Sequence, residues 1–451
     1  MKAVSIAAGT AGWLVLAAMG QSAKPDAGRP AADRPPAFGG TQTVAHATNT
    51  VAAAPAAPAA PAAPAVAAAP AVAAPPAVAA APAAATAPVT PAPVAPVPTP
   101  FMKTFTARTP AGITNALVRW GAWVKKDGVV RFPTDQAVLA ALNWLQREQQ
   151  ADGSWKGSKE IATPALTALA TLAYLGHGET PASAVYGTNV HKAVRWLLNN
   201  QEEDGRFKGR DARDYTQPIA ALALAEAYGL TLDPEVAKAA EKAAARIVKG
   251  QHPGGGFSYN LDQAARDDTS YMNWCAQALV AARMARLEVP GLERAIDKAS
   301  FALRQNADPG GGFGESGPGR TSVSGAGVAG LQFLGTAHVT EAQKTLELLS
   351  TNTFSQAIEE APLAPGASRF EAAWNLTQAR FQAGEESFRA WNKAMAGKLA
   401  GSQTRQRTMM TGWVDQGCWE RRGDPREAVI QDTCYGALML EVYYRYLPVG
   451  K

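Results

Sequence analysis

The chain is poor in the side chains that build metal sites and disulfide frameworks. Its 451 residues include three cysteines and five histidines. His46 precedes a long Ala/Pro-rich segment and the other histidines form no convergent set, so we expect no zinc and no cofactor. Three cysteines suit an exported protein that does not depend on disulfides. Cys418 and Cys434 could pair across one loop-to-helix junction, but three small buried side chains are the simpler interpretation.

The chain also lacks the charge and glycine patterns of nucleic-acid and nucleotide binding. Its net charge of +5 is small for its length, and its basic residues do not cluster. A nucleic-acid surface would need a basic stripe with interleaved aromatic residues, so we expect no nucleic-acid partner. The GGG runs at 254–256 and 310–312 precede aromatic residues and follow no predicted strand, which excludes a phosphate-binding loop.

The N-terminus is typical of an export signal. Lys2 supplies a positive charge, residues 4–19 form an uncharged and largely apolar run, and the small residues Ala18 and Gly20 offer a cleavage site before Gln21. The run is shorter than the roughly 20 apolar residues of a spanning helix. We therefore interpret residues 1–23 as a signal peptide or a membrane anchor, which places the protein outside the cytoplasm, either free or tethered.

A linker separates this segment from the folded part of the chain. Residues 52–100 are almost entirely Ala, Pro and Val, a composition that forbids continuous helix and favours polyproline II. We predict a disordered linker over 24–100 and a lead-in segment over 101–133. The lead-in should contain a helix at 113–125 and a turn at 127–128. The main domain is predicted to span 134–451.

A short motif recurs along this domain. QQADGSW at 149–155 returns as QEEDGRF at 201–207, as QHPGGGF at 251–257 and, extended, as QNADPGGGF at 305–313. A shortened copy, DQGCW, ends at 419. The aromatic positions of the complete copies lie 50 to 56 residues apart, and the gap to the last copy is 106 residues. A fixed period of this size indicates stacked supersecondary units.

We assign the motif a structural role in a turn. Its glycine ends a helix by adopting left-handed dihedral angles, and an aspartate at 152 or 204 bonds the local backbone. Its aromatic residue buries a large apolar face against the next unit. The residues with this role are the glutamines Gln149, Gln201, Gln251 and Gln305 and the aromatic residues Trp155, Phe207, Phe257, Phe313 and Trp419.

Two kinds of helix alternate between the motifs. The segments 191–201, 234–251 and 291–305 are amphipathic and charged, whereas 161–175, 269–282 and 321–335 carry no charge and should be buried on all sides. Six such pairs predict an all-α (α/α)6 toroid with the dry helices inside. An open solenoid would leave those helices exposed. The inner helices are expected to begin near Ala162, Tyr215, Thr269, Thr321, Arg369 and Gln431.

The starts of the inner helices carry capping residues and most of the candidate chemistry. The fifth inner helix is unusual because it carries Arg369, Glu371 and Arg380. Short polar side chains at these starts are expected to act as N-caps. The predicted caps are Thr163, Asp214, Asp268, Thr321, Ser368 and Asp432.

The Q-x-x-x-G-x-W/F motif resembles the QW-type repeat of terpenoid cyclases, such as squalene-hopene cyclases, and of protein prenyltransferase β subunits. The resemblance covers residues 134–448. The closing stretch DTCYGALMLEVYYRYLP at 432–448 is similar to that of secreted, single-toroid bacterial proteins of the squalene cyclase-like type. The resemblance implies an α/α toroid whose central cavity opens where the inner helices begin.

The catalytic motifs of these families are incomplete in this chain. Squalene-hopene cyclases use an acidic DxDD, where a carboxylic acid protonates an alkene. The matching place reads Ala265-Arg266-Asp267-Asp268, so Asp267 and Asp268 are candidate acids, with helix capping as the favoured alternative. The prenyltransferase zinc site also lacks its ligands: DTCY at 432–435 has an aspartate where the family has a histidine. The Gly-Cys-x-Glu-Gln run of complement-type thioester domains is absent.

Two further residue sets bear on function. Carbohydrate enzymes with this barrel use paired carboxylates, for which Asp214, Asp267, Asp268, Glu371 and Asp432 are candidates. The aromatic residues that line the cavity or pack the core are Tyr215, Tyr271, Trp274, Trp374 and Tyr435. The leading hypothesis is a non-catalytic toroid that binds a protein partner or an apolar small molecule at its central mouth. A single-domain terpene cyclase using Asp267 or Asp268 and a carbohydrate-active enzyme are the alternatives.

Overall fold

The computed structural model describes most of the C-terminal three quarters of the chain. The described residues all belong to one compact unit. The predicted signal segment and linker lie outside the described residues. No helix within the described part combines the length and apolarity needed to cross a membrane. The described residues are 108–122, 124–126, 128–157, 163–207, 215–264, 268–314, 321–359, 368–409 and 413–445.

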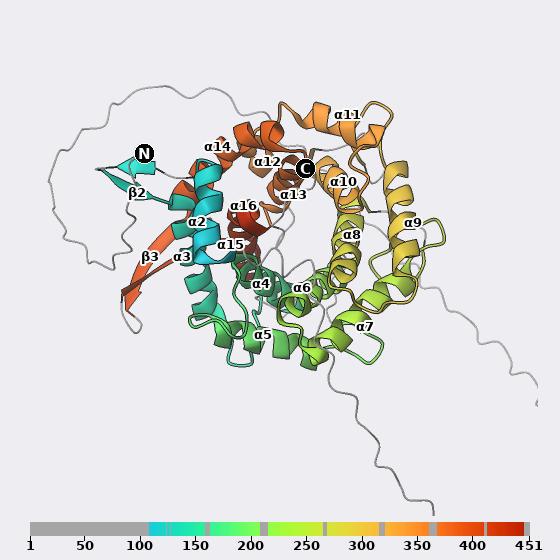
Figure 1. Cartoon of the computed structure of the whole chain (residues 1–451), viewed down its shortest axis with the longest axis horizontal. Coiled ribbons are helices and arrows are strands. Elements are labelled where there is room, and N and C mark those ends of the chain that lie inside the picture. The colour runs from blue at the N-terminus through green and yellow to red at the C-terminus, as the bar shows by residue number, and fades with distance from the viewer. Residues whose placement is uncertain are drawn as a thin grey trace, which may run out of the picture. The chain divides into compact units, whose positions relative to one another are not determined.

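Six helices form the inner ring of this unit. Each packs against the next in chain order, and the last packs against the first, so the ring is closed (Figure 1). We call the interior of this ring the lumen, and the end where the six helices begin the mouth. The inner helices are α4 (Thr163–His177), α6 (Thr216–Thr231), α8 (Thr269–Met284), α10 (Thr321–Phe333), α13 (Glu371–Gln382) and α15 (Arg426–Leu440).

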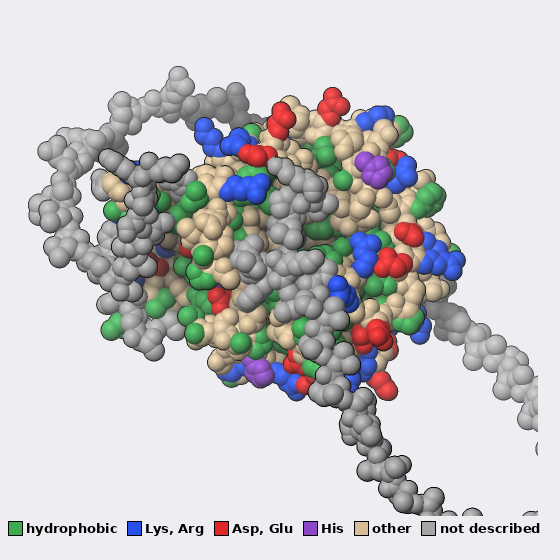
Figure 2. Space-filling model, in the orientation of Figure 1, with side chains coloured by type: hydrophobic (Ala, Val, Ile, Leu, Met, Phe, Trp, Pro, Cys, Tyr) green, Lys and Arg blue, Asp and Glu red, His purple; other side chains and the backbone are tan. Residues whose placement is uncertain are grey.

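A second layer of helices surrounds this ring, and contacts between α14 and α3 close it (Figure 1). The outer helices are α3 (Pro133–Glu148), α5 (Gly187–Asn199), α7 (Pro234–Gly250), α9 (Leu292–Gln305), α11 (Thr340–Leu349), α12 (Phe354–Glu359) and α14 (Glu385–Ser402). Charged side chains of both signs are intermixed over their visible surface (Figure 2). The predicted all-α (α/α)6 toroid of six hairpins is confirmed.

Smaller elements complete the unit: α2 (Pro110–Arg119), α16 (Val442–Arg445), β1 (Val124–Lys126), β2 (Val129–Arg131), β3 (Thr404–Met409) and β4 (Trp413–Cys418). The predicted lead-in helix at 113–125 was wrong at both ends, because Pro110 begins α2 after the N-cap Thr109 and residues 124–126 form a strand. β1 pairs antiparallel with β2 across the predicted turn, where Gly128 has φ +77°.

The motif turns join each outer helix to the next. The side chains of Gln149, Gln201 and Gln251 each donate to a backbone carbonyl of the following outer helix, at 2.9 to 3.0 Å. Gly205 has φ +85°, and a Cβ there would overlap the backbone of Lys242 in α7. Glycine is therefore required twice over, by its dihedral angle and by the close approach of the neighbouring helix.

The aromatic residue of each turn ties the outer helix to the inner one. The Trp155 indole Nε1–H donates to the carbonyl oxygen of Leu145 in α3 at 2.9 Å, and its backbone N–H donates to Thr167 Oγ1 in α4 at 3.1 Å. Trp155 is completely buried. The turn thus satisfies polar groups at a helix end while burying the largest apolar side chain of the repeat.

The sixth turn departs from the predicted motif. Trp419 bonds the carbonyl of Leu399 at 3.0 Å and Thr433 Oγ1 at 3.4 Å, as Trp155 does in its own hairpin, but strand β4 precedes it. The glutamine of this turn is Gln403, which donates to the carbonyl of Ala137 in α3 at 2.9 Å and so joins the last outer helix to the first. The β3–β4 hairpin is inserted between Gln403 and Trp419.

The fourth turn also differs from its prediction. Its isolated bridge joins Ala307 to Phe313, as Gln201 joins Phe207 and Gln251 joins Phe257 in their turns. Gln305 is exposed at the end of α9. The two extra residues of QNADPGGGF shift the glutamine out of the position that contacts the next helix, so Ala307 stands at the equivalent place.

A buried charge cluster lies near the end of the inner ring opposite the mouth. Glu226 of α6 accepts from Arg108 Nη1 at 2.9 Å and from Arg445 Nη2 at 2.9 Å, and all three side chains are at most 3% exposed. Arg108 also donates to the carbonyl of Leu175 at the end of α4. Burial opposes ionisation of Glu226, but Arg445 and Arg108 outweigh it and lower the pKa of its carboxyl.

Candidate functional site

Three tyrosines gather at the mouth around Asp268. Tyr215 at the start of α6 lies 5.9 Å from Tyr259 and 5.8 Å from Tyr271, and Tyr259 lies 4.9 Å from Tyr271, between ring centroids. Burial raises the pKa of the Tyr215 hydroxyl, and the charges of Glu371 and Asp268 raise it further. These rings pack on one another at ordinary aromatic distances. Their outer members, Tyr215 and Tyr259, remain partly exposed.

Asp268 is the N-cap of α8, as the capping prediction required. Its Oδ1 accepts from the backbone N–H of Tyr271 at 3.0 Å, and its Oδ2 accepts from the Tyr259 hydroxyl. The side chain is buried. Both oxygens therefore accept hydrogen bonds from the fold. Asp267, the other candidate acid, lies outside the described residues, as does the predicted cap Asp214.

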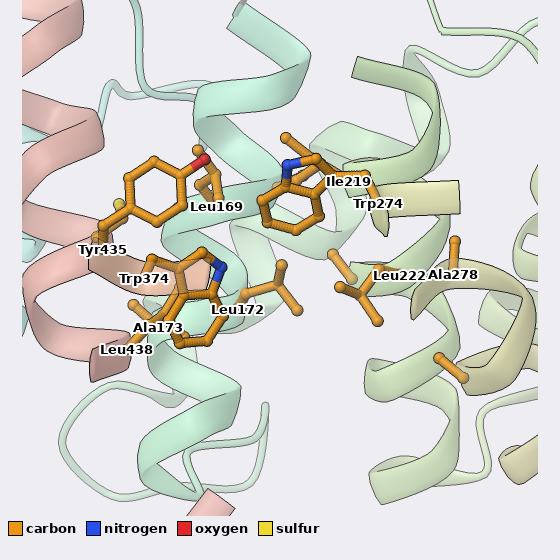
Figure 3. Packing of buried hydrophobic residues seen from close by; sticks show 14 of the residues in the cluster. Leu169, Leu172, Ala173, Ile219, Leu222, Trp274, Ala278, Trp374, Tyr435 and Leu438 are labelled. Carbon is orange, nitrogen blue, oxygen red and sulfur yellow. The ribbon is translucent and has the colours of Figure 1, made fainter. Parts of the chain in front are cut away.

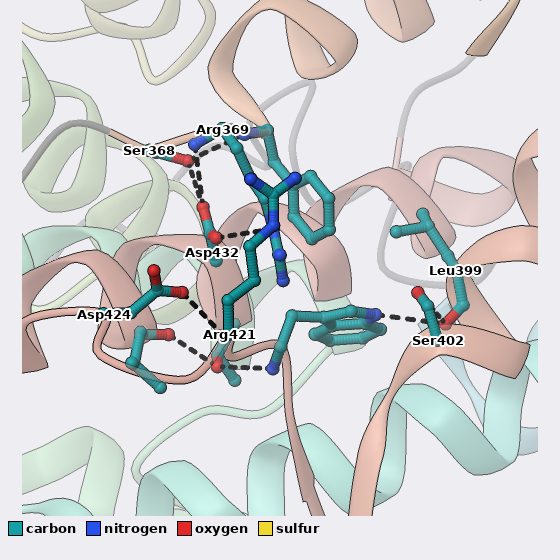
Figure 4. A network of polar contacts seen from close by, with 11 residues as sticks. Ser368, Arg369, Leu399, Ser402, Arg421, Asp424 and Asp432 are labelled. Atoms are coloured by element: carbon teal, nitrogen blue, oxygen red, sulfur yellow. Dashed lines mark hydrogen bonds and ion pairs between the residues drawn. The ribbon is translucent and has the colours of Figure 1, made fainter. Parts of the chain in front are cut away.

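Asp432 joins two inner helices through a buried polar network (Figure 4). Its Oδ1 accepts from the Ser368 hydroxyl at 2.6 Å and from the backbone N–H of Arg369 at 3.1 Å, and its Oδ2 lies 2.9 Å from Arg369 Nε. Burial raises the pKa of Asp432 to about 6, although the bond from Ser368 and the charge of Arg369 act in the opposite direction.

The predicted role of Asp432 as a helix cap was wrong. α15 begins at Arg426, five residues before the expected start, so Asp432 lies inside the helix. Its carboxylate instead bonds the segment that leads into the neighbouring helix, α13. The sequence analysis therefore identified an acidic residue near a helix start, but the helix start is that of α13 and not that of α15.

Glu371 is the acidic residue at the start of α13. Its side chain is partly exposed, in contrast to those of Asp268 and Asp432. Burial raises the pKa of the Tyr215 and Tyr435 hydroxyls most, and the negative charge of Glu371 raises both pKa values further. Glu371 therefore lies near tyrosines of two other inner helices, and places negative charge at the mouth.

Aromatic side chains of three inner helices meet in the lumen. The ring centroids of Trp274 and Trp374 each lie 6.4 Å from that of Tyr435, and all three residues are at most 4% exposed. Trp374 and Tyr435 face Trp274 and Leu222 across the lumen, with Leu172 between them (Figure 3). We call Trp274, Trp374 and Tyr435 the lumen aromatics.

Sequence reasoning brings most of these residues together but misses two contributors. Tyr215 and Tyr271 lie at the mouth, and the lumen aromatics lie deeper. Tyr259 lies in a loop and had no motif to mark it, although its position nine residues before Asp268 could have suggested contact across a turn. A second omission is a set of amide side chains on α8 and α13. Within the described residues, no group of His, Cys, Asp and Glu could hold a metal ion.

The cysteines are not part of this site. All three, Cys275, Cys418 and Cys434, are buried and unpaired. Burial raises the pKa of the Cys275 thiol well above its usual range, so it is not a nucleophile at neutral pH. The simpler sequence interpretation, three small buried side chains, describes them correctly.

Comparison with known proteins places the chain by fold. No protein-family model and no curated protein matches it. Among solved structures, an inactive variant of the α-1,6-mannanase GH76A of Salegentibacter sp. HEL1_6, in complex with α-1,6-mannotriose, matches with a TM-score of 0.50 and 10% identity, over 69% of this chain and 98% of that one.

A second kind of enzyme gives a weaker match. The type II terpene cyclase MstE of Scytonema matches with a TM-score of 0.42 and 13% identity, over 70% of this chain and 98% of that one. At these identities the likeness concerns architecture alone. The chain shares the (α/α)6 toroid fold.

Proposed function

We propose that this domain is an exported, non-catalytic toroid that binds an apolar ligand in its lumen. The observation that carries the proposal is that Asp268 and Asp432, the two aspartates described at the mouth, are hydrogen-bonded within the fold. Asp268 and Asp432 each use both carboxylate oxygens within the fold. An acid that protonates an alkene must present a protonated oxygen to its substrate. Both side chains are also buried, so their bonds and their burial together support a structural role for the two aspartates.

The walls of the lumen support an apolar ligand. Leu169 and Leu172 of α4, Ile219 and Leu222 of α6 and Ala278 of α8 surround the lumen aromatics (Figure 3). Ligand sites are mostly apolar, with a few polar groups that fix orientation. The proposal of export rests on the N-terminal sequence, in which the apolar run at 4–19 is either cleaved or retained as a membrane tether.

The test measures binding of radiolabelled n-dodecane to the full-length protein by equilibrium dialysis. The variant Ala278→Phe fills the lumen with an added ring. The control Ala390→Phe adds the same ring to an exposed position on the outer helix α14. We expect wild type and the control to bind dodecane and Ala278→Phe to lose at least tenfold in affinity, with circular dichroism unchanged. Turnover of squalene that is lost in Asp268→Asn would overturn the proposal.

Glu371 and the aspartate pair favour a second candidate, a carbohydrate-active enzyme. The inactive mannanase variants are changed at two consecutive aspartates, and this chain has such a pair at Asp267–Asp268, at the start of an inner helix. Glu371 is partly exposed at the same mouth. Hydrolysis of α-1,6-mannotetraose by the wild type, lost in both Asp267→Asn and Glu371→Gln, would establish this candidate. We expect no hydrolysis.

A further inference from the structure

Four buried amide side chains of α8 and α13 form two hydrogen-bonded pairs that pass α10 on its lumen side. Asn273 Nδ2 donates to Asn375 Oδ1 at 3.1 Å, and Gln378 Nε2 donates to Gln277 Oε1 at 2.9 Å. These two pairs, which we call the amide ladder, join α8 to α13, the two neighbours of α10 in the inner ring. α10 carries glycine at 325, 327 and 330, and both neighbours pack closely on it: Gly325 lies against Leu376 of α13 and Gly330 against Asn273 of α8.

The helix geometry places the lower pair of the ladder directly beneath the lumen aromatics. Gln277 follows Trp274 by three residues and Gln378 follows Trp374 by four, and residues at these spacings share one helix face. Both tryptophans point into the lumen (Figure 3). Gln277 and Gln378 therefore also face the lumen, about one helical turn further from the mouth.

Three amide atoms on the neighbouring helices α8 and α10 have no hydrogen-bond partner. They are Asn273 Oδ1, Gln277 Nε2 and Gln332 Oε1, the last on α10. The three residues that carry these atoms are buried, with exposed fractions of 0%, 4% and 4%. A buried polar atom without a partner is unfavourable, and proteins leave such atoms where a water or ligand satisfies them. The wall thus offers one free donor group and two free acceptors.

The chemistry of these atoms defines the group that they would bind. The known partners of Asn273, Gln277 and Gln332 are amides and a backbone carbonyl, so the site is uncharged. A hydroxyl group can accept from Gln277 Nε2 and donate to an amide oxygen. A carbonyl could only accept, and a charged group would remain uncompensated in this apolar interior.

We propose that the amide ladder binds the hydroxyl group of an alcohol whose apolar body lies among the lumen aromatics. This proposal rests on the proposed function and specifies its ligand class. We expect the ligand to enter from the mouth, because the other end carries the buried Arg108–Glu226–Arg445 cluster. Its hydroxyl reaches the ladder between Trp274 on one side and Trp374 on the other. The ladder then selects among apolar molecules by hydrogen bonding, because a hydrocarbon leaves Asn273 Oδ1 and Gln277 Nε2 without a partner.

The experiment compares two probes that differ by one hydroxyl group, 1-dodecanol and n-dodecane, in equilibrium dialysis against the full-length protein. The variant Gln277→Leu removes the free donor and keeps a similar side-chain volume. The control Gln343→Leu makes the same change at an exposed position on the outer helix α11. We expect the wild type and the control to bind the alcohol at least tenfold more tightly than the alkane. In Gln277→Leu this preference should fall to within about twofold while the alkane still binds.

The outcomes separate the two proposals. Equal binding of alcohol and alkane by the wild type would overturn the amide ladder as a hydroxyl site and leave the apolar lumen in place, with water as the occupant of the ladder. An undiminished preference in Gln277→Leu would do the same. Binding of neither probe by the wild type would overturn the proposed function itself.

Discussion

The strongest perturbation of the fold should be the loss of one buried charge, in Glu226→Gln. Glu226 bridges Arg108 and Arg445 at 2.9 Å each, so the variant removes the carboxylate that both guanidinium groups contact. Glu441 is a second buried carboxyl near these arginines, but neither of its oxygens makes a hydrogen bond. Breaking a buried ion pair by removing one partner costs about 3–5 kcal/mol. The bridge also joins residues separated by 118 and 219 positions, and so holds the two ends of the domain to α6.

The assay is thermal unfolding of the full-length protein followed by circular dichroism. For a domain of about 320 residues (134–451), each kcal/mol shifts Tm by roughly 1.5 °C, so Glu226→Gln should lower Tm by roughly 4–8 °C. The control Glu235→Gln removes the same charge from a pair with Arg195 whose side chains are 60% and 40% exposed. Such surface pairs contribute about 1 kcal/mol or less. A Tm for Glu226→Gln within 2 °C of the wild type, or an equal loss in the control, would refute the reasoning.

Three further substitutions test other parts of the fold by urea unfolding. Gly205→Ala should lower the free energy of unfolding by on the order of 2–4 kcal/mol, because an alanine is strained in the left-handed backbone of Gly205 and its Cβ would overlap Lys242. The control Gly397→Ala in α14 should be neutral or stabilising. Gln403→Ala should cost about 1–2 kcal/mol through the lost bond to Ala137, unlike Gln343→Ala on the surface. Burial raises the pKa of Glu441 well above its usual range, so its contribution to stability is complete below about pH 4.5 and is lost as the pH rises. Glu441→Gln should therefore flatten the fall in stability between pH 5 and pH 8, and an unchanged slope would contradict this assignment.

Much of the fold could be predicted because its signals are local and repeated. The turn at Gln149–Trp155 combines a helix end, a left-handed glycine and a buried aromatic residue, and each of these leaves a mark in the sequence. The absence of charge from the inner helices then specifies which layer lies inside. The closed ring follows, because an open arc would expose those helices to water.

The sixth hairpin was predicted, but its turn and the start of its inner helix were misplaced because their signals are not local. The β3–β4 insertion separates Gln403 from Trp419, so the motif is no longer contiguous although both residues make the expected contacts. α15 begins at Pro425-Arg426, without a polar N-cap, so the capping rule favoured Asp432 instead. That aspartate satisfies the start of a different helix, which no sequence spacing could indicate.

The candidate site was predictable in its aromatic part and not in its polar part. Trp274 and Trp374 lie on inner helices at positions that must be buried. The amide ladder depends on pairs 101 and 102 residues apart, Gln277–Gln378 and Asn273–Asn375. The sequence did carry a sign of this site, since the four amide residues lie on inner helices whose other residues are mostly apolar. The sequence could not predict which of these amides pair, or which of their atoms are left without a partner.

Photolabelling tests the central claim, a lumen that binds an apolar alcohol, most directly. A twelve-carbon alkanol that carries a diazirine is bound to the full-length protein, activated by light and located by mass spectrometry of the digested chain. The account predicts labels on the lumen faces of α4, α6, α8 and α13, around Leu172, Leu222, Trp274 and Trp374, and their loss in the presence of excess 1-dodecanol. Labels confined to the outer helices, or labels that excess 1-dodecanol does not displace, would contradict it.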